Sequence, residues 1–167
     1  GMIGEMVMRC DKDISPLAPK NVAAIQGHGE MHWRALAQLI TALENDKADA
    51  NVVAALRTQA AQLKVPVLGI TGTGGAGKSS LTDELIRRLR LDQDDALRVA
   101  VISIDPSRKR TGGALLGDRI RMNAIEHPNI FMRSLATRRA HLATSAVLKD
   151  CIQLLKYAGF DERTFRY

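Results

Sequence analysis

The chain has 167 residues, of which 46% are hydrophobic, so it can bury a core without disulfide or metal staples. Its formal net charge of +6 suits a polyphosphate ligand or an acidic partner, whereas the aromatic content of 4% and the scattered basic residues argue against nucleic acid. No apolar run approaches the ~20 residues that span a bilayer and the cysteines, Cys10 and Cys151, lie far apart, so we expect a cytoplasmic protein with reduced thiols and no membrane partner.

The first 64 residues are predicted to form an arm followed by helices. Prolines and glycines interrupt residues 1–29, which we expect to be an irregular arm or linker, mobile unless it packs on something. Residues 30–64 are predicted to be a helical extension. The apolar face of its first helix comprises Trp33, Leu36, Leu39, Ile40 and Leu43. A second helix is expected to bury Val52, Val53, Leu56, Ala60 and Leu63.

The pattern changes at residue 65, where short apolar segments begin to alternate with helical ones. Residues 65–71 are apolar and end in glycine, which is typical of a buried parallel strand. Residues 98–105 and 129–135 are predicted to be the next strands, and a helix is predicted over residues 138–157. The helix after the first strand is expected to place Leu81, Leu85, Ile86 and Leu89 on its inner side. This alternation predicts an α/β fold over residues 65–167, with a mostly parallel sheet flanked by helices.

A phosphate-binding motif lies between the first predicted strand and its helix. Its sequence is Gly72-Thr73-Gly74-Gly75-Ala76-Gly77-Lys78-Ser79, which matches the P-loop pattern G-x-x-x-x-G-K-[ST] at every fixed position. Glycines let the backbone wrap around an anion, and the following helix adds the positive end of its dipole. We expect Lys78 to reach the β- and γ-phosphates and Ser79 to bind Mg²⁺, with Ser80 also among the nucleotide-binding residues. The chain is therefore predicted to bind a nucleoside diphosphate or triphosphate with Mg²⁺.

Charged residues after the second predicted strand are further candidates for the site. Asp105 is the last residue of that strand, at the edge of the sheet where open α/β folds place their ligands, and could hold a Mg²⁺ water or orient the attacking water. A helix cap is the structural alternative for this residue. In the basic and glycine-rich stretch of residues 108–121, Asp118 could reach the metal and Arg121 the phosphates, although such a stretch can also be a solvated face.

One other group of polar residues is a weaker candidate for a site. His28, Glu30 and His32 could suggest a metal site, but Gly27 and Gly29 argue against a stiff helix that presents them together, so we favour ordinary surface polarity. The sequence shows no arrangement of Ser, His and Asp or of Cys and His that indicates a nucleophilic enzyme.

Three separated segments resemble the MeaB/ArgK group of G-proteins over residues 31–160. Residues 34–44 are similar to the helix that precedes the P-loop in this group. Asp105-Pro106-Ser107 and residues 110–122 resemble its signature D-P-S-x-x-x-T-G-G-x-x-x-G-D-x-x-R-M, and residues 71–81 are similar to the G-domain of fused isobutyryl-CoA mutases. The resemblance implies a GTPase that assists an adenosylcobalamin-dependent acyl-CoA mutase, fused or separate, in cofactor loading and protection. It implies GTP or GDP with Mg²⁺ as ligands, while adenosylcobalamin stays on the mutase.

The resemblance also implies roles for individual residues and leaves alternatives open. Lys78, Asp105 and Asp118 would be catalytic, Ser79, Asp105 and Asp118 would serve the metal, and residues 111–121 would be the first switch region. However, the family's Walker-B Glu-Thr, second switch and Asn-Lys-x-Asp loop are absent from these residues, so we expect an incomplete G-domain with weak or no hydrolysis. A small-molecule kinase and a non-catalytic interaction module that binds nucleotide remain alternatives.

The resemblance further implies that the family's Walker-B strand lies between the strands at residues 65–71 and 98–105. An empty slot there would leave unpaired backbone groups, which cost about 1–3 kcal/mol each when buried. The two strands could close on each other, residues 161–167 could fill the slot, or a second copy could donate a strand. Because Glu162, Arg163 and Arg166 make the tail a poor central strand, we expect strand exchange or edge pairing between copies in a homo-oligomer.

Overall fold

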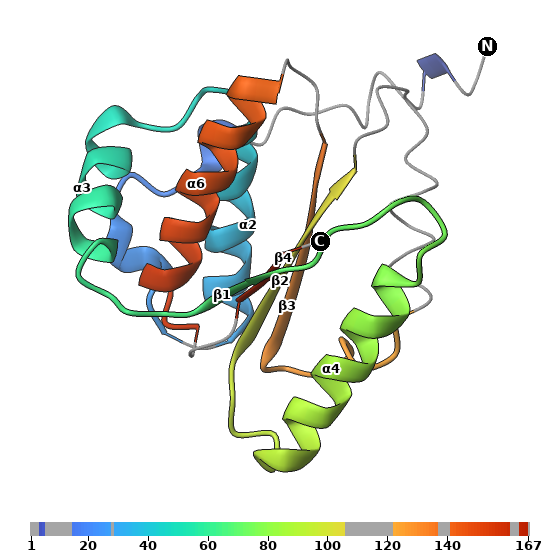
Figure 1. Cartoon of the computed structure of the whole chain (residues 1–167). Helices are drawn as coiled ribbons and strands as arrows, with labels where there is room; N and C mark the ends of the chain where they lie inside the picture. The colour runs from blue at the N-terminus through green and yellow to red at the C-terminus, as the bar shows by residue number, and fades with distance from the viewer. Residues whose placement is uncertain are drawn as a thin grey trace.

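The computed structural model describes residues 4–5, 15–27, 29–105, 122–136, 141–160 and 164–166. Helices lie on both sides of a parallel sheet, as Figure 1 shows. In chain order the elements are η1 (Ser15–Leu17), η2 (Val22–Ile25), α2 (Glu30–Glu44), α3 (Ala50–Ala60), β1 (Val67–Gly69), α4 (Lys78–Asp92), β2 (Val99–Asp105), β3 (Ile130–Ala136), α6 (His141–Tyr157) and β4 (Thr164–Arg166). The predicted α/β fold with a helical N-terminal extension is confirmed.

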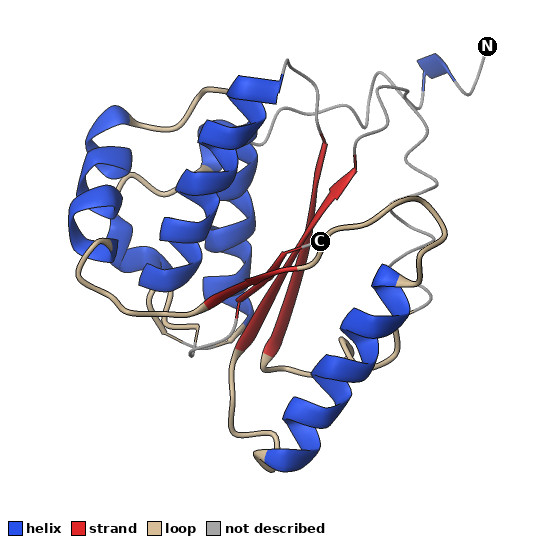
Figure 2. Cartoon of the chain, in the orientation of Figure 1, coloured by secondary structure: helices blue, strands red, loops and turns tan. Residues whose placement is uncertain are grey.

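The sheet has the order β1-β4-β2-β3, and all its pairs are parallel. Helices α2, α3 and α6 lie on one side of this sheet and α4 on the other (Figure 2). The sequence places the second and third strands correctly to within one residue, because their apolar runs are buried between the two layers. The carboxyl ends of these parallel strands share one edge, and the β1–α4 loop begins there.

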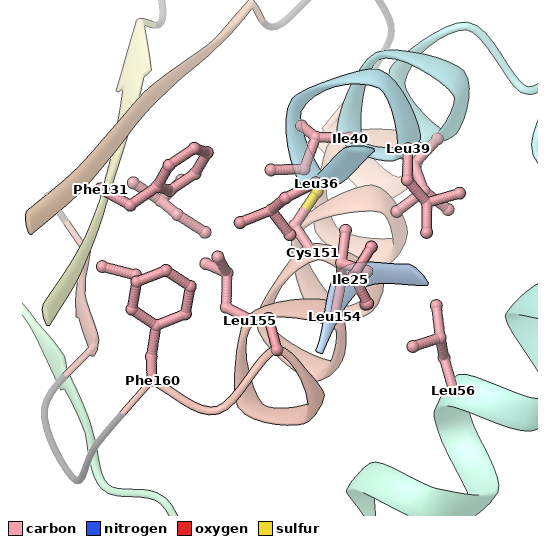
Figure 3. Packing of buried hydrophobic residues seen from close by; sticks show 14 of the residues in the cluster. Ile25, Leu36, Leu39, Ile40, Leu56, Phe131, Cys151, Leu154, Leu155 and Phe160 are labelled. Carbon is pink, nitrogen blue, oxygen red and sulfur yellow. The ribbon is translucent and has the colours of Figure 1, made fainter. Parts of the chain in front are cut away.

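The larger hydrophobic core lies between the sheet and the layer of α2, α3 and α6 (Figure 3). In α2 the predicted apolar face is confirmed, since Leu36, Leu39, Ile40 and Leu43 are buried and Trp33 is partly buried. The Trp33 ring stacks on Phe131 of β3 with centroids 5.2 Å apart. Asp49 caps the next helix, α3, because its Oδ1 accepts the backbone N–H groups of Asn51 and Val52.

The segment before α2 packs on this core within the described residues 15–27. Ile25 is 1% exposed, and Asn45 at the end of α2 donates a hydrogen bond from Nδ2 to Ser15 Oγ at 3.1 Å. Arg98 at the entrance to β2 donates to the carbonyl oxygens of Gly27, Ala158 and Gly159. This part of the predicted arm is therefore joined to the helical layer and to the sheet.

Four apolar residues are more exposed than the sequence indicates. The strand predicted over residues 65–71 is short and not buried, because β1 lies at the edge of the sheet, with Val67 37% and Leu68 46% exposed. Leu63 follows the end of α3 and is 40% exposed. Leu81 is 52% exposed, because the buried face of α4 is centred on Thr82 and Ile86, and neighbouring helical residues point about 100° apart.

The slot between β1 and β2 is filled by the end of the same chain. Residue Thr164 of β4 pairs with Val67 and Ala100, Phe165 with Leu68 and Val101, and Arg166 with Gly69 and Ile102. The expectation that a second copy supplies this strand is therefore wrong. Parallel pairing uses backbone groups, so a three-residue segment is enough to connect β1 with β2, even in a tail that carries several charged residues.

Candidate nucleotide-binding site

The predicted P-loop connects the edge strand β1 to α4 on the outside of the protein (Figure 1). The residues from Thr71 to Gly77 are exposed, and α4 begins at Lys78. Gly75 and Gly77 have φ values of +77° and +81°, which side chains with a Cβ adopt at a cost. At these two positions the backbone conformation itself explains the requirement for glycine.

At Gly74 neither the backbone conformation nor a neighbouring atom of the chain requires glycine. Its φ is not in the left-handed region, and a Cβ built on it would meet no atom within 4 Å. The space beside Gly74 is therefore open. A glycine at such a position is expected where an external group approaches the backbone closely, as an anion does in a phosphate-binding loop.

The ammonium group of Lys78 is directed back into the loop. Its Nζ donates hydrogen bonds to the carbonyl oxygens of Gly72 at 3.0 Å and Thr73 at 2.8 Å. The loop closes on itself through a further bond from Ala76 N to Thr73 O at 3.3 Å. These contacts place the positive charge at the loop and next to the N-terminus of α4, where an anion is stabilised by both.

The first turn of α4 fixes the residues that follow the lysine. Leu81 N donates to Gly77 O at 2.9 Å, and the Thr82 hydroxyl, which is fully buried, donates to Lys78 O at 2.8 Å. Ser79 is half-buried in this turn, whereas Ser80 is exposed. The hydroxyl of Ser79 therefore lies on the same helical turn as Lys78, which is the arrangement that a Mg²⁺ ligand beside a P-loop lysine needs.

Only part of the predicted site lies among the residues that the structure describes. Asp105 is the last residue of β2, three residues beyond Ile102, and Ile102 is level with Gly69 of β1 through β4. At about 3.3 Å per residue, Asp105 lies roughly 10 Å further along the strand, at the sheet edge from which the loop starts. Asp118, Arg121 and the rest of the predicted switch at residues 111–121 lie outside the described residues.

Two residues of α4 that the sequence analysis did not single out hold the segment that leads into β3. Asp83 Oδ1 accepts the backbone N–H of Ala124 at 2.8 Å, and Arg90 NH1 donates to the carbonyl oxygen of Ala124 at 3.0 Å. Their spacing of seven residues puts both on one face of the helix. This spacing is the only sign in the sequence that Asp83 and Arg90 act together. It does not reveal their partner, the backbone of Ala124, which lies 41 positions from Asp83 and 34 from Arg90.

Arg90 also forms an ion pair that is sensitive to pH. Its Nε lies 2.6 Å from Asp95 Oδ1, and this hydrogen bond holds the pKa of the Asp95 carboxyl below its usual value. His127 Nε2 lies 3.7 Å from the same oxygen. A carboxylate whose pKa is lowered by folding stabilises the protein above the unfolded pKa, and this contribution is lost as the pH falls through the folded pKa.

We therefore expect Asp95→Asn to lower the melting temperature at about pH 7, and the difference from wild type to shrink once the pH falls below the unfolded carboxyl pKa of about 4 towards the lower folded pKa. Asparagine tolerates the φ of 56° found at Asp95, so the substitution removes the charge without straining the backbone. Thermal unfolding of both proteins across this range is the measurement, with the exposed Asp92→Asn as a control. A difference from wild type that does not change with pH would contradict the assignment.

The described residues offer little for other chemistry. Burial raises the pKa of the Cys151 thiol to about 12, so this cysteine is not a nucleophile at neutral pH. Within the described ranges, no group of three or more His, Cys, Asp and Glu side chains could hold a metal ion. In the same ranges, no helix combines the length and the apolar character that a bilayer crossing requires.

Comparison with known proteins places these features in a family. The family model described as methylmalonyl Co-A mutase-associated GTPase MeaB matches residues 36–164. The fused isobutyryl-CoA mutase of Cupriavidus metallidurans is 66% identical over 161 residues, which are 96% of this chain and 14% of that protein. The corresponding enzyme of Nocardia farcinica is 51% identical over 164 residues, which are 96% of this chain and 15% of its own length.

Shorter relatives and a solved structure agree with this result. A protein of Pyrococcus horikoshii whose name designates it a GTPase is 43% identical over 129 residues, covering 77% of this chain and 39% of its own. A crystal structure titled as a LAO/AO transport system kinase aligns with a TM-score of 0.53 and 24% identity, over 80% of this chain and 38% of that one, and supports the fold alone. The chain thus spans well under half the length of each of these proteins.

Proposed function

Because the chain belongs to the methylmalonyl-CoA mutase-associated GTPase family MeaB, we propose that its P-loop binds GTP and GDP with Mg²⁺ in the service of an adenosylcobalamin-dependent acyl-CoA mutase. The observation that carries the proposal is the loop itself. Its lysine ammonium is aimed at the loop carbonyls, its glycines take the required backbone angles, and the space beside Gly74 is open.

The described residues fit a polyphosphate group. Lys78 exchanges its two bonds to the carbonyls of Gly72 and Thr73 for bonds to phosphate oxygens, which are stronger acceptors because they are charged. Backbone N–H groups at the N-terminus of α4 add further donors. The binding energy at this part of the site therefore comes from phosphate recognition.

Hydroxyl and carboxylate oxygens are the donors that Mg²⁺ prefers, and Ser79 in the first turn of α4 and Asp105 at the end of β2 are residues of these types. Mg²⁺ would neutralise charge on the β- and γ-phosphates when it is bound. We propose Ser79 as its direct ligand, with Asp105 and Asp118 serving the metal and the attacking water. Arg121 is proposed to contact the phosphates.

The mutase-related role rests on the relatives. Two of them are named fused isobutyryl-CoA mutases, and each matches nearly all of this chain. We propose that the chain acts with an acyl-CoA mutase, either within one polypeptide or as a separate partner, and that nucleotide binding controls loading and protection of the mutase cofactor. Adenosylcobalamin would remain on the mutase.

Calorimetric titration of the chain with GDP, GTP and ATP in the presence of Mg²⁺ tests the proposed ligand. We expect saturable binding of GDP and GTP at one site per chain, with ATP binding to a comparable degree, because these residues lack the Asn-Lys-x-Asp loop that reads guanine in the family. Clearly tighter binding of ATP than of GTP would contradict the assignment to guanine nucleotides. No saturable binding of any nucleotide would contradict the proposed function.

We further expect a polypeptide of these 167 residues to hydrolyse GTP at a rate close to the background rate. Phosphoryl transfer depends on a positioned metal and water. The strand β4, with the sequence Thr164-Phe165-Arg166, does not carry the Glu-Thr pair that the family resemblance leads one to expect on its Walker-B strand. Phosphate release under multiple-turnover conditions measures the rate, and robust turnover would overturn this expectation.

A further inference from the structure

The helix that carries Lys78 and Ser79 rests on the sheet through a narrow apolar face. In α4 the buried residues are Thr82 and Ile86, whereas Leu81 and Leu91 are 52% and 67% exposed. Ile86 belongs to a small core with Val99 and Val101 of β2, against which Leu85 and Leu89 pack while remaining partly exposed. A helix held by so few buried side chains needs other contacts to fix its position along its own axis.

Those contacts converge on the backbone of one buried residue. Ala124 is 6% exposed and lies in the same small core as Ile86. Its N–H is bonded to Asp83 at 2.8 Å and its carbonyl oxygen to Arg90 at 3.0 Å. Because Asp83 and Arg90 are seven residues apart, about 10 Å along a helix, the two bonds together resist sliding, rotation and tilting of α4 against the segment from Met122 to Ile125.

The turn after α4 is attached to the same segment. Arg90 is paired with Asp95 at 2.6 Å, and Asn129 Nδ2 donates to the Asp95 carbonyl oxygen at 2.9 Å. Asn129 directly precedes β3, and its own carbonyl oxygen accepts the N–H of Val99, the first residue of β2. Through these bonds α4 is tied to the starts of the two long strands of the sheet.

We propose that Asp83 and Arg90 are positioning residues of the phosphate site, which act through the backbone N–H and C=O of Ala124 to fix Lys78 and Ser79 relative to the sheet. This inference rests on the proposed function. Asp83 follows Lys78 by five residues, or about 7.5 Å of helix, so a shift at Asp83 is transmitted to the lysine by a rigid element. Displacements of about 1 Å at a site of this kind have large effects on the interactions of the bound group.

The test compares variants that remove a contact between α4 and Ala124 with a control that removes a contact between two other helices. Asp83→Ala leaves the buried N–H of Ala124 without its acceptor, whereas Asp83→Asn retains an oxygen acceptor. Asp150→Ala is the matched control, because Asp150 joins α6 to α3 through two bonds to Arg57 of 2.8 Å each, among the helices on the opposite side of the sheet from α4 (Figure 2). The Kd for GDP with Mg²⁺ is measured by calorimetry at a temperature at which circular dichroism shows every variant to be folded.

We expect Asp83→Ala to weaken GDP binding about tenfold, Asp83→Asn to stay within about threefold of wild type, and Asp150→Ala to bind like wild type even if its melting temperature falls. If Asp83→Ala does not fold, Arg90→Gln, which removes the bond to the Ala124 carbonyl, is expected to show the same loss. Unchanged GDP affinity in folded Asp83→Ala or Arg90→Gln would overturn the inference. An equal loss of GDP affinity in Asp150→Ala would also overturn it. Failure of the wild-type chain to bind GDP would instead contradict both the proposed function and this inference.

Discussion

Replacing Lys78 by alanine is expected to weaken GDP binding by about 2–5 kcal/mol, because it removes the side-chain cation that we propose to contact the β-phosphate. The structure shows this ammonium within hydrogen-bond distance of the carbonyl oxygens of Gly72 and Thr73, the first two residues of the loop. Lys78 is only half-buried, so we expect the melting temperature of the unliganded protein to change little.

Calorimetric titration of wild type and Lys78→Ala with GDP measures this effect. Lys149→Ala is a suitable control, because Lys149 is an exposed lysine on α6, among the helices on the other side of the sheet from α4 (Figure 2). It should bind GDP like wild type. Equal affinity of wild type and Lys78→Ala would show that the lysine does not contact the phosphates, and the assignment of the loop would then be wrong.

The second large effect is expected at β4. Phe165→Pro removes a backbone N–H from a strand that is paired on both sides, with Leu68 of β1 and Val101 of β2 opposite. Each buried backbone group that loses its partner costs about 1–3 kcal/mol, so we expect a loss of several kcal/mol in unfolding free energy or failure to fold. Chemical denaturation is the measurement.

Phe165→Val is the control for this substitution, because it keeps the backbone donor and a residue type that favours strands. It is expected to be much closer to wild type than Phe165→Pro. If proline is tolerated as well as valine, β4 does not pair as a central strand in solution. The slot between β1 and β2 would then have to be filled in another way, such as the exchange of a strand between copies.

Local sequence patterns were sufficient for most of the fold and for the loop at which we propose the site. The P-loop is recognisable because its glycines, Lys78 and Ser79 are contiguous and their spacing is set by the chemistry of phosphate binding. The strands β2 and β3 are recognisable because each begins with a run of buried apolar residues. The α2 face is recognisable because Leu36, Leu39, Ile40 and Leu43 follow the helical period.

Contacts between distant segments were not predictable in the same way. The tail was expected to be a poor central strand because of its charges, but pairing in a sheet is made by the backbone, and side-chain composition gives only a weak preference. The exposure of β1 depends on the order of the strands, which its own sequence does not contain. Asp83 and Arg90 looked like ordinary charged helix residues, because their partner is the backbone of Ala124.

The central claim is that the loop from Gly72 to Ser79 recognises the β-phosphate of a nucleotide. Calorimetric titration of the chain with GDP and with GMP, both with Mg²⁺, tests it most directly, because the two ligands differ only in that phosphate. We predict one saturable site for GDP and at least a roughly tenfold weaker Kd for GMP, since charged hydrogen bonds from Lys78 and the α4 N-terminus are lost. Equal affinity for GDP and GMP, or no binding of GDP, would contradict the claim.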